Sequence, residues 1–229
     1  MSTTATFRPG VTAAPQAWEP ASIFDLEGLE EAPVVREPYE TLTVPGFVRA
    51  DALRAINADY PAIDEAAALD LELLTYGPAF AAMTDYLRGD AFAGLMSAKF
   101  GVDLMALPRM VSVRSLAAPD DGHIHSDSKT KVVTVLLYFN TSWTQRGGQL
   151  RVLRSATDME DYAAEVPPVN GTLFAFRRCD HSWHGFPPCT GERRSLQLQY
   201  VKPKRAERGF LRKTSLKKRV KRALRGVGL

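Results

Sequence analysis

Residues that cross-link or anchor a protein are scarce in this chain. Its 229 residues include only two cysteines, which excludes a framework of several disulfides. Cys179 and Cys189 are expected to be reduced thiols rather than a pair across a hairpin. The longest apolar run lies within 132–139 and is far too short to span a bilayer, and residues 1–10 lack the basic start and apolar stretch of a secretory signal. These absences predict a cytoplasmic protein.

The overall charge conceals an asymmetry between the body of the chain and its end. The net charge is +3 at pH 7, but residues 202–229 carry twelve lysines and arginines against one acid, Glu207, which leaves residues 1–201 at −8. Hydrophobic residues make up 45% of the chain, enough for the core of one domain. The composition therefore indicates an acidic globular body followed by a basic tail.

Four histidines are all the chain has, and they form two pairs near turns, His123 with His125 and His181 with His184. Asp127 follows His125 by two residues, and side chains two apart point to the same side of an extended backbone. Two imidazoles and one carboxylate on one face of an ion are typical of non-haem Fe(II) centres. His125, Asp127 and one histidine of the later pair are therefore candidate metal ligands.

Hydrophobic periodicity changes along the chain from helical to strand-like. Before residue 107 it predicts a strand at 39–44 and helices at 49–60, 78–87 and 90–100. After residue 107 it predicts six short strands, at 109–116, 131–140, 149–153, 172–177, 182–186 and 193–201. Helices followed by antiparallel strands favour an α+β, mainly β fold, with the N-terminal helices packed on one face of the sheet.

Further residues accompany the two histidine pairs in a fixed order. Residues 134–140 form an apolar strand that ends in Tyr-Phe-Asn, residues 147–150 are Gly-Gly-Gln-Leu, and Arg193 stands nine residues after His184. In this order, over residues 110–201, the sequence resembles the Fe(II)/2-oxoglutarate-dependent dioxygenases, in particular their prolyl-4-hydroxylase-like branch. The resemblance implies a double-stranded β-helix, a jelly-roll, cupin-like barrel with the metal in its mouth.

The resemblance also implies the metal ligands and the chemistry. His125, Asp127 and His184 would hold Fe(II), because their spacings to one another and to Arg193 fit the family pattern. The iron would bind the keto-acid end of 2-oxoglutarate and leave a position for O2. Halogenases of this superfamily have a small residue in place of the carboxylate, so the presence of Asp127 implies hydroxylation, with succinate and CO2 as co-products.

Three further residues are expected to bind the cosubstrate. In the family pattern an arginine stands three residues before an aliphatic residue, which favours Arg193 for the distal carboxylate of 2-oxoglutarate and leaves Arg194 as the alternative. Tyr138 is expected to add a hydrogen bond to the same carboxylate. Arg114 occupies a strand position where the branch often has a cosubstrate-binding tyrosine. It would hold 2-oxoglutarate, contact an anionic substrate, or pair with Asp120 or Asp121.

Four segments follow from these patterns: a disordered arm at 1–20, a strand and helices supporting the barrel at 21–106, the catalytic barrel at 107–202, and a basic amphipathic tail at 203–229. The tail suits an anionic membrane surface or another acidic partner, which would make the protein peripheral to the membrane. Nucleic acid is less favoured because no aromatic residues are interleaved with the basic ones. Packing on the acidic body is as well supported as these binding roles together.

The substrate is indicated only by the branch, which suggests a prolyl-type residue, peptidyl or free. A saccharide or another small metabolite is the alternative substrate. A different class of function is a metal-binding barrel without turnover that acts through its basic tail. The triad together with Arg193 argues against that class.

Overall fold

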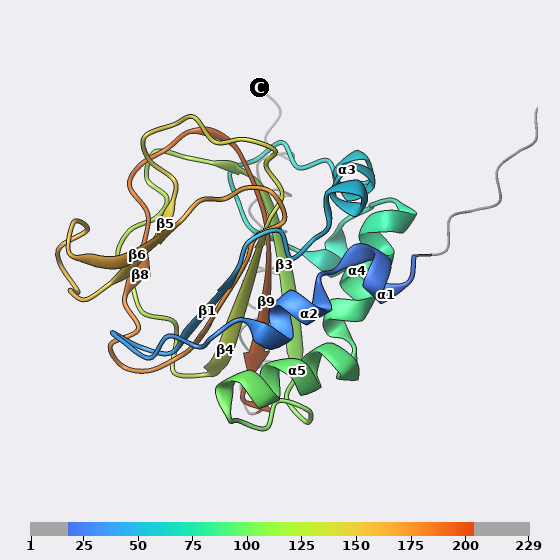
Figure 1. Cartoon of the computed structure of the whole chain (residues 1–229). Helices are drawn as coiled ribbons and strands as arrows, with labels where there is room; N and C mark the ends of the chain where they lie inside the picture. Colours follow the sequence, from blue (N-terminus) through green and yellow to red (C-terminus); the bar gives the residue numbers. More distant parts are fainter. Residues whose placement is uncertain (1–17, 204–229) are drawn as a thin grey trace, which may run out of the picture.

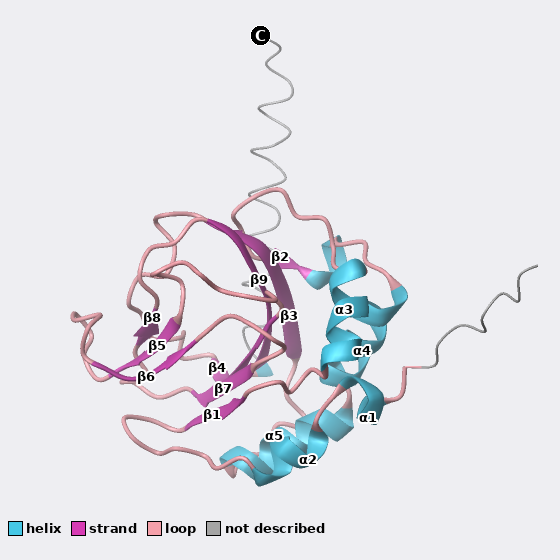
Figure 2. Cartoon of the chain, turned by 45° about the horizontal axis from the view of Figure 1, so that its top comes forward, coloured by secondary structure: helices cyan, strands magenta, loops and turns pink. Residues whose placement is uncertain are grey.

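The structure, a computed structural model, describes residues 18–203 and consists of helices packed on one face of a large β-sheet, with a small sheet on the other side (Figures 1 and 2). The helices are α1 (Pro20–Ile23), α2 (Leu26–Glu31), α3 (Ala50–Ala58), the 3-10 helix η1 (Leu71–Leu73), α4 (Pro78–Arg88) and α5 (Asp90–Phe100). Most of the expected arm and of the basic tail lies outside the described residues, although α1 begins within the arm at Pro20.

The buried face and the C-terminal end of helix α5 follow from its sequence. In α5, Phe92, Met96 and Phe100 recur at four-residue intervals and are all buried. The helix ends at Gly101, whose φ of 58° lies in the left-handed region that glycine adopts without steric cost. The predicted range of α5 is confirmed, and that of α4 is confirmed to within one residue. Within residues 18–203, no helix is both long and apolar enough to cross a membrane.

Two antiparallel sheets face each other. The large sheet has the order β1 (Thr41–Val44), β7 (Leu173–Arg177), β4 (Lys131–Tyr138), β9 (Gly191–Val201), β3 (Arg109–Ala117) and β2 (Leu69–Asp70). The small sheet has the order β6 (Tyr162–Val166), β5 (Leu150–Leu153) and β8 (His184–Gly185). An isolated bridge between His125 and His184 extends the small sheet by one more segment. This arrangement confirms the α+β, mainly β fold and agrees with a double-stranded β-helix.

The large sheet separates two apolar clusters. Its outer face, which includes Val135 of β4 and Leu198 of β9, packs against buried helix residues such as Phe92. Its inner face contributes Tyr138 and Phe176 to a second cluster with apolar residues of the small sheet. Alternation along each strand therefore assigns one set of side chains to the helices and the other set to the barrel interior.

Two parts of the sequence prediction were incomplete. All six predicted strands after residue 107 are present, but the strand expected at 182–186 spans only His184–Gly185. Strand β6 was not predicted, because residues 162–165 are exposed on both faces and show no alternation. The short helices α1 and α2 were also not predicted. The boundaries drawn at residues 106 and 202 remain a prediction.

Replacement of Phe92 tests how much the helix layer depends on its core. Phe92 is fully buried, and Phe92→Ala should lower the free energy of unfolding by about 3–5 kcal/mol, because it removes a large apolar side chain and leaves a cavity. The measurement is chemical denaturation. The matched control is Leu73→Ala, since Leu73 is 53% exposed and its truncation should change stability by less than about 0.5 kcal/mol. Equal losses in both variants would contradict the core described above.

Candidate metal centre

The backbone holds two of the candidate ligands together. The N–H of His125 donates to the carbonyl of His184, and the N–H of His184 donates to the carbonyl of His125, both at 3.0 Å. The imidazole centroids consequently lie 4.3 Å apart. This approach requires glycine at position 122, where φ is +85° and a Cβ would lie 2.5 Å from Phe186.

Asp127 completes a cluster of three potential ligands. One ligand atom from each of His125, Asp127 and His184 lies within 4.8 Å of the other two. Asp127 and His184 are each 4% exposed, whereas His125 is exposed, so the cluster opens to solvent on one side. His123 and His181 are exposed and do not belong to the cluster.

Both histidine rings are oriented by carbonyl oxygens. Nδ1 of His125 lies 2.9 Å from the carbonyl oxygen of His123, and Nδ1 of His184 lies 3.0 Å from that of Ser182. A carbonyl oxygen only accepts, so each Nδ1 carries the hydrogen and each Nε2 keeps its lone pair for a metal. Burial, together with the nearby His125, lowers the pKa of His184 to about 4. The His184 ring is therefore neutral at neutral pH, the form that binds metals.

Both oxygens of Asp127 are also held in place. Thr134 of β4 donates its hydroxyl to Oδ2 at 2.6 Å, and the Lys131 ammonium donates to Oδ1. Burial alone would raise the pKa of Asp127, but the charge of Lys131, the nearby His184 and the two hydrogen bonds lower it below the ordinary value. The carboxylate therefore stays charged and fixed in orientation.

A second charged group lies at the other end of the barrel interior. Arg193 of β9 is 4% exposed, and its Nε donates to the carbonyl of Gly148 at 2.9 Å. Its guanidinium carbon lies 4.2 Å from the ring centroid of Phe186 and 5.3 Å from that of Tyr138. Within the described residues, neither Nη2 of Arg193 nor Oη of Tyr138 has a hydrogen-bond partner, although both atoms are buried.

Two unpaired buried donors are suited to an anion. A buried charge without a counterion is costly, and a guanidinium fits a carboxylate closely. Burial raises the pKa of Tyr138, so its phenol keeps the proton that it would donate. The residues present therefore fit a ligand that has a carboxylate at this end of the barrel and a second metal-binding end near the histidines.

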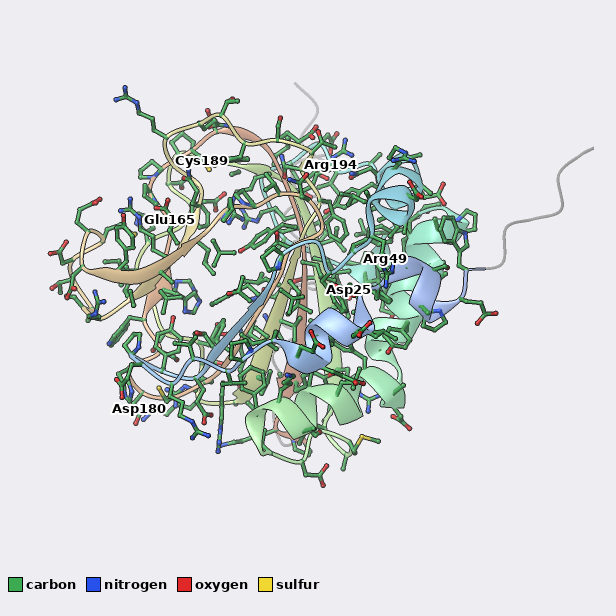
Figure 3. The ribbon with its side chains drawn as sticks, in the orientation of Figure 1. Asp25, Arg49, Glu165, Asp180, Cys189 and Arg194 are labelled. Atoms are coloured by element: carbon green, nitrogen blue, oxygen red, sulfur yellow. The ribbon has the colours of Figure 1, made fainter. Side chains whose placement is uncertain are left out.

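Arg194 points away from this interior. It lies between β9 and α3 (Figure 3), where its Nη1 donates to Oδ1 of Asn57 at 3.3 Å and its guanidinium carbon lies 5.2 Å from the ring centroid of Tyr60. Arg114 faces the interior but forms an ion pair with Asp121, whose Oδ2 also accepts from the N–H of Ala118. Of the three contacts foreseen for Arg114, the structure contains the pairing with Asp121.

Sequence reasoning did not identify Thr134, Lys131 or Phe186 as neighbours of the site. Thr134 has a usable signal, because it precedes Tyr138 by four residues on one strand and must share its inner face. Lys131 and Phe186 carry no such signal, since their contacts depend on the turn at 128–130 and on the path of the chain after β8.

An antiparallel double-sheet barrel with two histidines and one carboxylate at its mouth is the architecture of a non-haem iron oxygenase. Residues 114–201 match the family model described as 2OG-Fe(II) oxygenase superfamily. The matched region contains all three triad residues, so residues 114–201 are a region of the 2OG-Fe(II) oxygenase type. The enzyme class implied by the resemblance, and with it Fe(II) and 2-oxoglutarate, is confirmed.

Solved structures with the same fold are distant in sequence. A prolyl 4-hydroxylase from Phytophthora capsici is 17% identical, with a TM-score of 0.53, and the match covers 86% of this chain and 70% of that chain. A prolyl-4-hydroxylase from Pseudomonas putida is 20% identical, with a TM-score of 0.48, and the match covers 84% of this chain and 98% of that chain. No curated protein matches the sequence. At these identities the first likeness shows the fold alone.

Replacement of Thr134 tests the orientation of the carboxylate ligand. Thr134→Val keeps the shape of the side chain but removes the hydroxyl that donates to Asp127, and it should weaken metal binding by about 10- to 100-fold. The measurement is a titration with Mn(II), followed by electron paramagnetic resonance.

Thr130→Val is the matched control, because the Thr130 hydroxyl contacts Ser128 on the neighbouring turn. It should leave the Mn(II) affinity within about twofold of the starting protein. An unchanged affinity in Thr134→Val would mean that metal binding by Asp127 does not depend on the Thr134 hydroxyl.

Proposed function

We propose that the protein hydroxylates a C–H bond of a prolyl-type residue, peptidyl or free, or of a small molecule, with Fe(II), 2-oxoglutarate and O2, and releases succinate and CO2. The observation that carries the proposal is the pair of unpaired buried donors, Arg193 Nη2 and Tyr138 Oη, inside the same barrel as the triad. A metal-binding protein without turnover has no need of a buried, uncompensated guanidinium.

Each residue has a distinct task in this proposal. His125, Asp127 and His184 hold Fe(II), which together with 2-oxoglutarate supplies the oxidising chemistry when bound. Arg193 binds the distal carboxylate and Tyr138 donates to it, so the keto-acid end is directed towards the triad. Because its charge is already balanced by Asp121, Arg114 orients the loop before His125 and is the weaker candidate for cosubstrate binding.

The substrate part of the proposal has weaker support than the reaction type. Prolyl 4-hydroxylase is the printed activity of the Phytophthora capsici protein that shares the fold, and this favours a prolyl-type substrate over the saccharide or other metabolite that remains the alternative. An intact Asp127 favours hydroxylation. The alternative of a barrel that acts through its basic tail concerns residues 203–229, nearly all of which lie outside the described residues.

The direct test of the proposed function is spectroscopic. Addition of Fe(II) and 2-oxoglutarate without air should give a visible charge-transfer band, and admission of O2 should release succinate. His125→Ala, Asp127→Ala and His184→Ala should each abolish both signals, because each removes one ligand of the triad. His181→Ala, which changes an exposed histidine outside the cluster, should retain them. A charge-transfer band that persists in His184→Ala would contradict the assignment of His184 as a metal ligand.

The cosubstrate anchor can be tested separately with two adjacent arginines. Arg193→Ala should raise the Kd of 2-oxoglutarate by about 10- to 100-fold, since it removes charge-assisted hydrogen bonds worth about 1.5–3 kcal/mol. The measurement is a titration of the anaerobic charge-transfer band. Arg194→Ala is the control, because Arg194 contacts Asn57 and Tyr60 on the helix side. The reverse result would assign the anchor to Arg194.

A further inference from the structure

The inner face of the large sheet is filled unevenly. On β4 and β7, inner-facing side chains such as Tyr138 and Phe176 are fully buried against the small sheet. On β9 and β3, Gln197, Gln199 and Ser112 are only half-buried. These three residues, called the polar strip below, are uncharged polar side chains, and their inner-facing neighbours Met110 and Leu136 are also half-buried.

Strand register places the polar strip on the inner face. Gln199 is opposite Thr134 of β4, and Gln197 is opposite Ser112 of β3. Paired residues of antiparallel strands share a face, and Thr134 points inward to Asp127. Side chains directly opposite one another have Cβ atoms about 4.5–5.5 Å apart, so Gln199 lies beside the threonine that holds a metal ligand.

The segment that carries the exposed ligand His125 lies on the side of the same strands. At one edge of the small sheet, Ala164 of β6 lines a pocket together with Thr43 of β1. The opposite edge is the segment that carries His125, and Asp121 just before that segment pairs with Arg114 of β3. The exposed ligand His125 therefore lies over the β3 and β9 side, where the polar strip is found.

The side chains of the polar strip have donors and acceptors that are not used within the described part of the protein. Within residues 18–203, no protein atom makes a hydrogen bond with the side chains of Gln197, Gln199 or Ser112. Two carboxamides and one hydroxyl provide both donors and acceptors. Polar groups that face a partly enclosed interior without a protein partner are available to a ligand or to water.

The charged groups that border the strip are already balanced. Arg114 pairs with Asp121, and Lys131 pairs with Asp127. Arg178, which donates to the carbonyl of Asp127, forms an ion pair with Asp180 at 2.8 Å. A charged substrate group would therefore lose hydration there without gaining a free counterion. Arg193, by contrast, precedes Ser195, the β9 partner of Arg114, by two residues, and it lies six residues from Gln199 along the strand.

We propose that the polar strip binds the primary substrate, that Gln199 contacts the group next to the reacting C–H bond, and that this group is an uncharged amide. A glutamine carboxamide matches an amide, because each has one N–H side and one C=O side that can pair reciprocally. This inference rests on the proposed function and narrows its substrate. The amide belongs either to a peptide chain or to a small neutral molecule.

The first experiment compares neutral and charged probes with the full chain, Fe(II) and 2-oxoglutarate in air. The probes are N-acetyl amino-acid methylamides, terminally blocked tripeptides, the corresponding free amino acids, and methyl glycosides. The expected result is that blocked compounds raise succinate release above the substrate-free rate while free amino acids do not. Stimulation by tripeptides alone identifies a peptide source, and stimulation by methylamides identifies a small amide.

Other outcomes overturn the inference. Stimulation by free amino acids or glycosides but not by blocked amides would contradict the amide class, and so would the absence of any response to amides. The proposed function has a separate readout, because the anaerobic charge-transfer band requires no primary substrate. A band without amide stimulation would therefore reject this inference and leave the proposed function standing.

The second experiment tests Gln199 itself. Gln199→Leu should raise the KM of the stimulating amide roughly three- to tenfold, the loss expected for one neutral hydrogen bond, with a smaller change in the Kd of 2-oxoglutarate. Gln199→Glu keeps the size of the side chain and introduces an unpaired carboxylate, so it should raise the same KM even if the leucine variant folds poorly. Gln145→Leu, on an exposed loop, is the control. An unchanged KM in both Gln199 variants would exclude contact with the substrate.

Discussion

The site depends on one pair of backbone hydrogen bonds, the reciprocal N–H to carbonyl contacts between His125 and His184. These residues come from segments far apart in the sequence, and this bridge brings their rings within 4.3 Å of each other. Each imidazole then needs only a local carbonyl, from His123 or Ser182, to set its orientation. The close approach also explains Gly122, since a side chain there would collide with Phe186. The position of the two histidine ligands is therefore set by backbone pairing, and their side chains only need to be oriented.

Charge balance distinguishes the residues that hold the site together from those that are free to bind. Asp127, Arg114 and Arg178 each face an opposite charge, so their electrostatic role is completed within the protein. Arg193 is as buried as Asp127, yet within residues 18–203 its Nη2 has no hydrogen-bond partner. An unpaired buried charge lowers stability, and the proposed 2-oxoglutarate carboxylate would supply the missing anion. The positive charge of Arg193 is therefore not balanced at the point where the proposed anionic cosubstrate would bind.

Features that depend on local pattern could be predicted from the sequence, and features that depend on chain path could not. Alternation along an extended backbone was enough to place His125 and Asp127 on one side of the chain, but it does not separate His125 from His123, which was set aside only because its spacing to Asp127 does not fit the family motif. Apolar spacing predicted α5 without error. Strand β6 was missed because exposure on both faces removes the alternation that marks a strand. The contact of Lys131 with Asp127 depends on a turn whose geometry has no signature in the residues. The sequence likewise does not identify the ion-pair partner of Arg114, because the position of Asp121 depends on the path of the loop at 118–121.

In strand β9, the residues that stabilise the fold and the residues proposed to bind ligands lie on opposite faces. Its outward residues Leu196, Leu198 and Tyr200 are fully buried against the helices, and its backbone pairs with β4 on one side and β3 on the other. The strand is therefore held by one face and by its hydrogen bonds, which leaves the inner face free to carry polar groups. The roles proposed for Arg193, an anion anchor, and for Gln199, a neutral contact, can differ because neither side chain belongs to the face that packs β9 against the helices. Substitutions on that face should alter ligand preference with little effect on the barrel, whereas the same changes one residue along the strand would disturb the core.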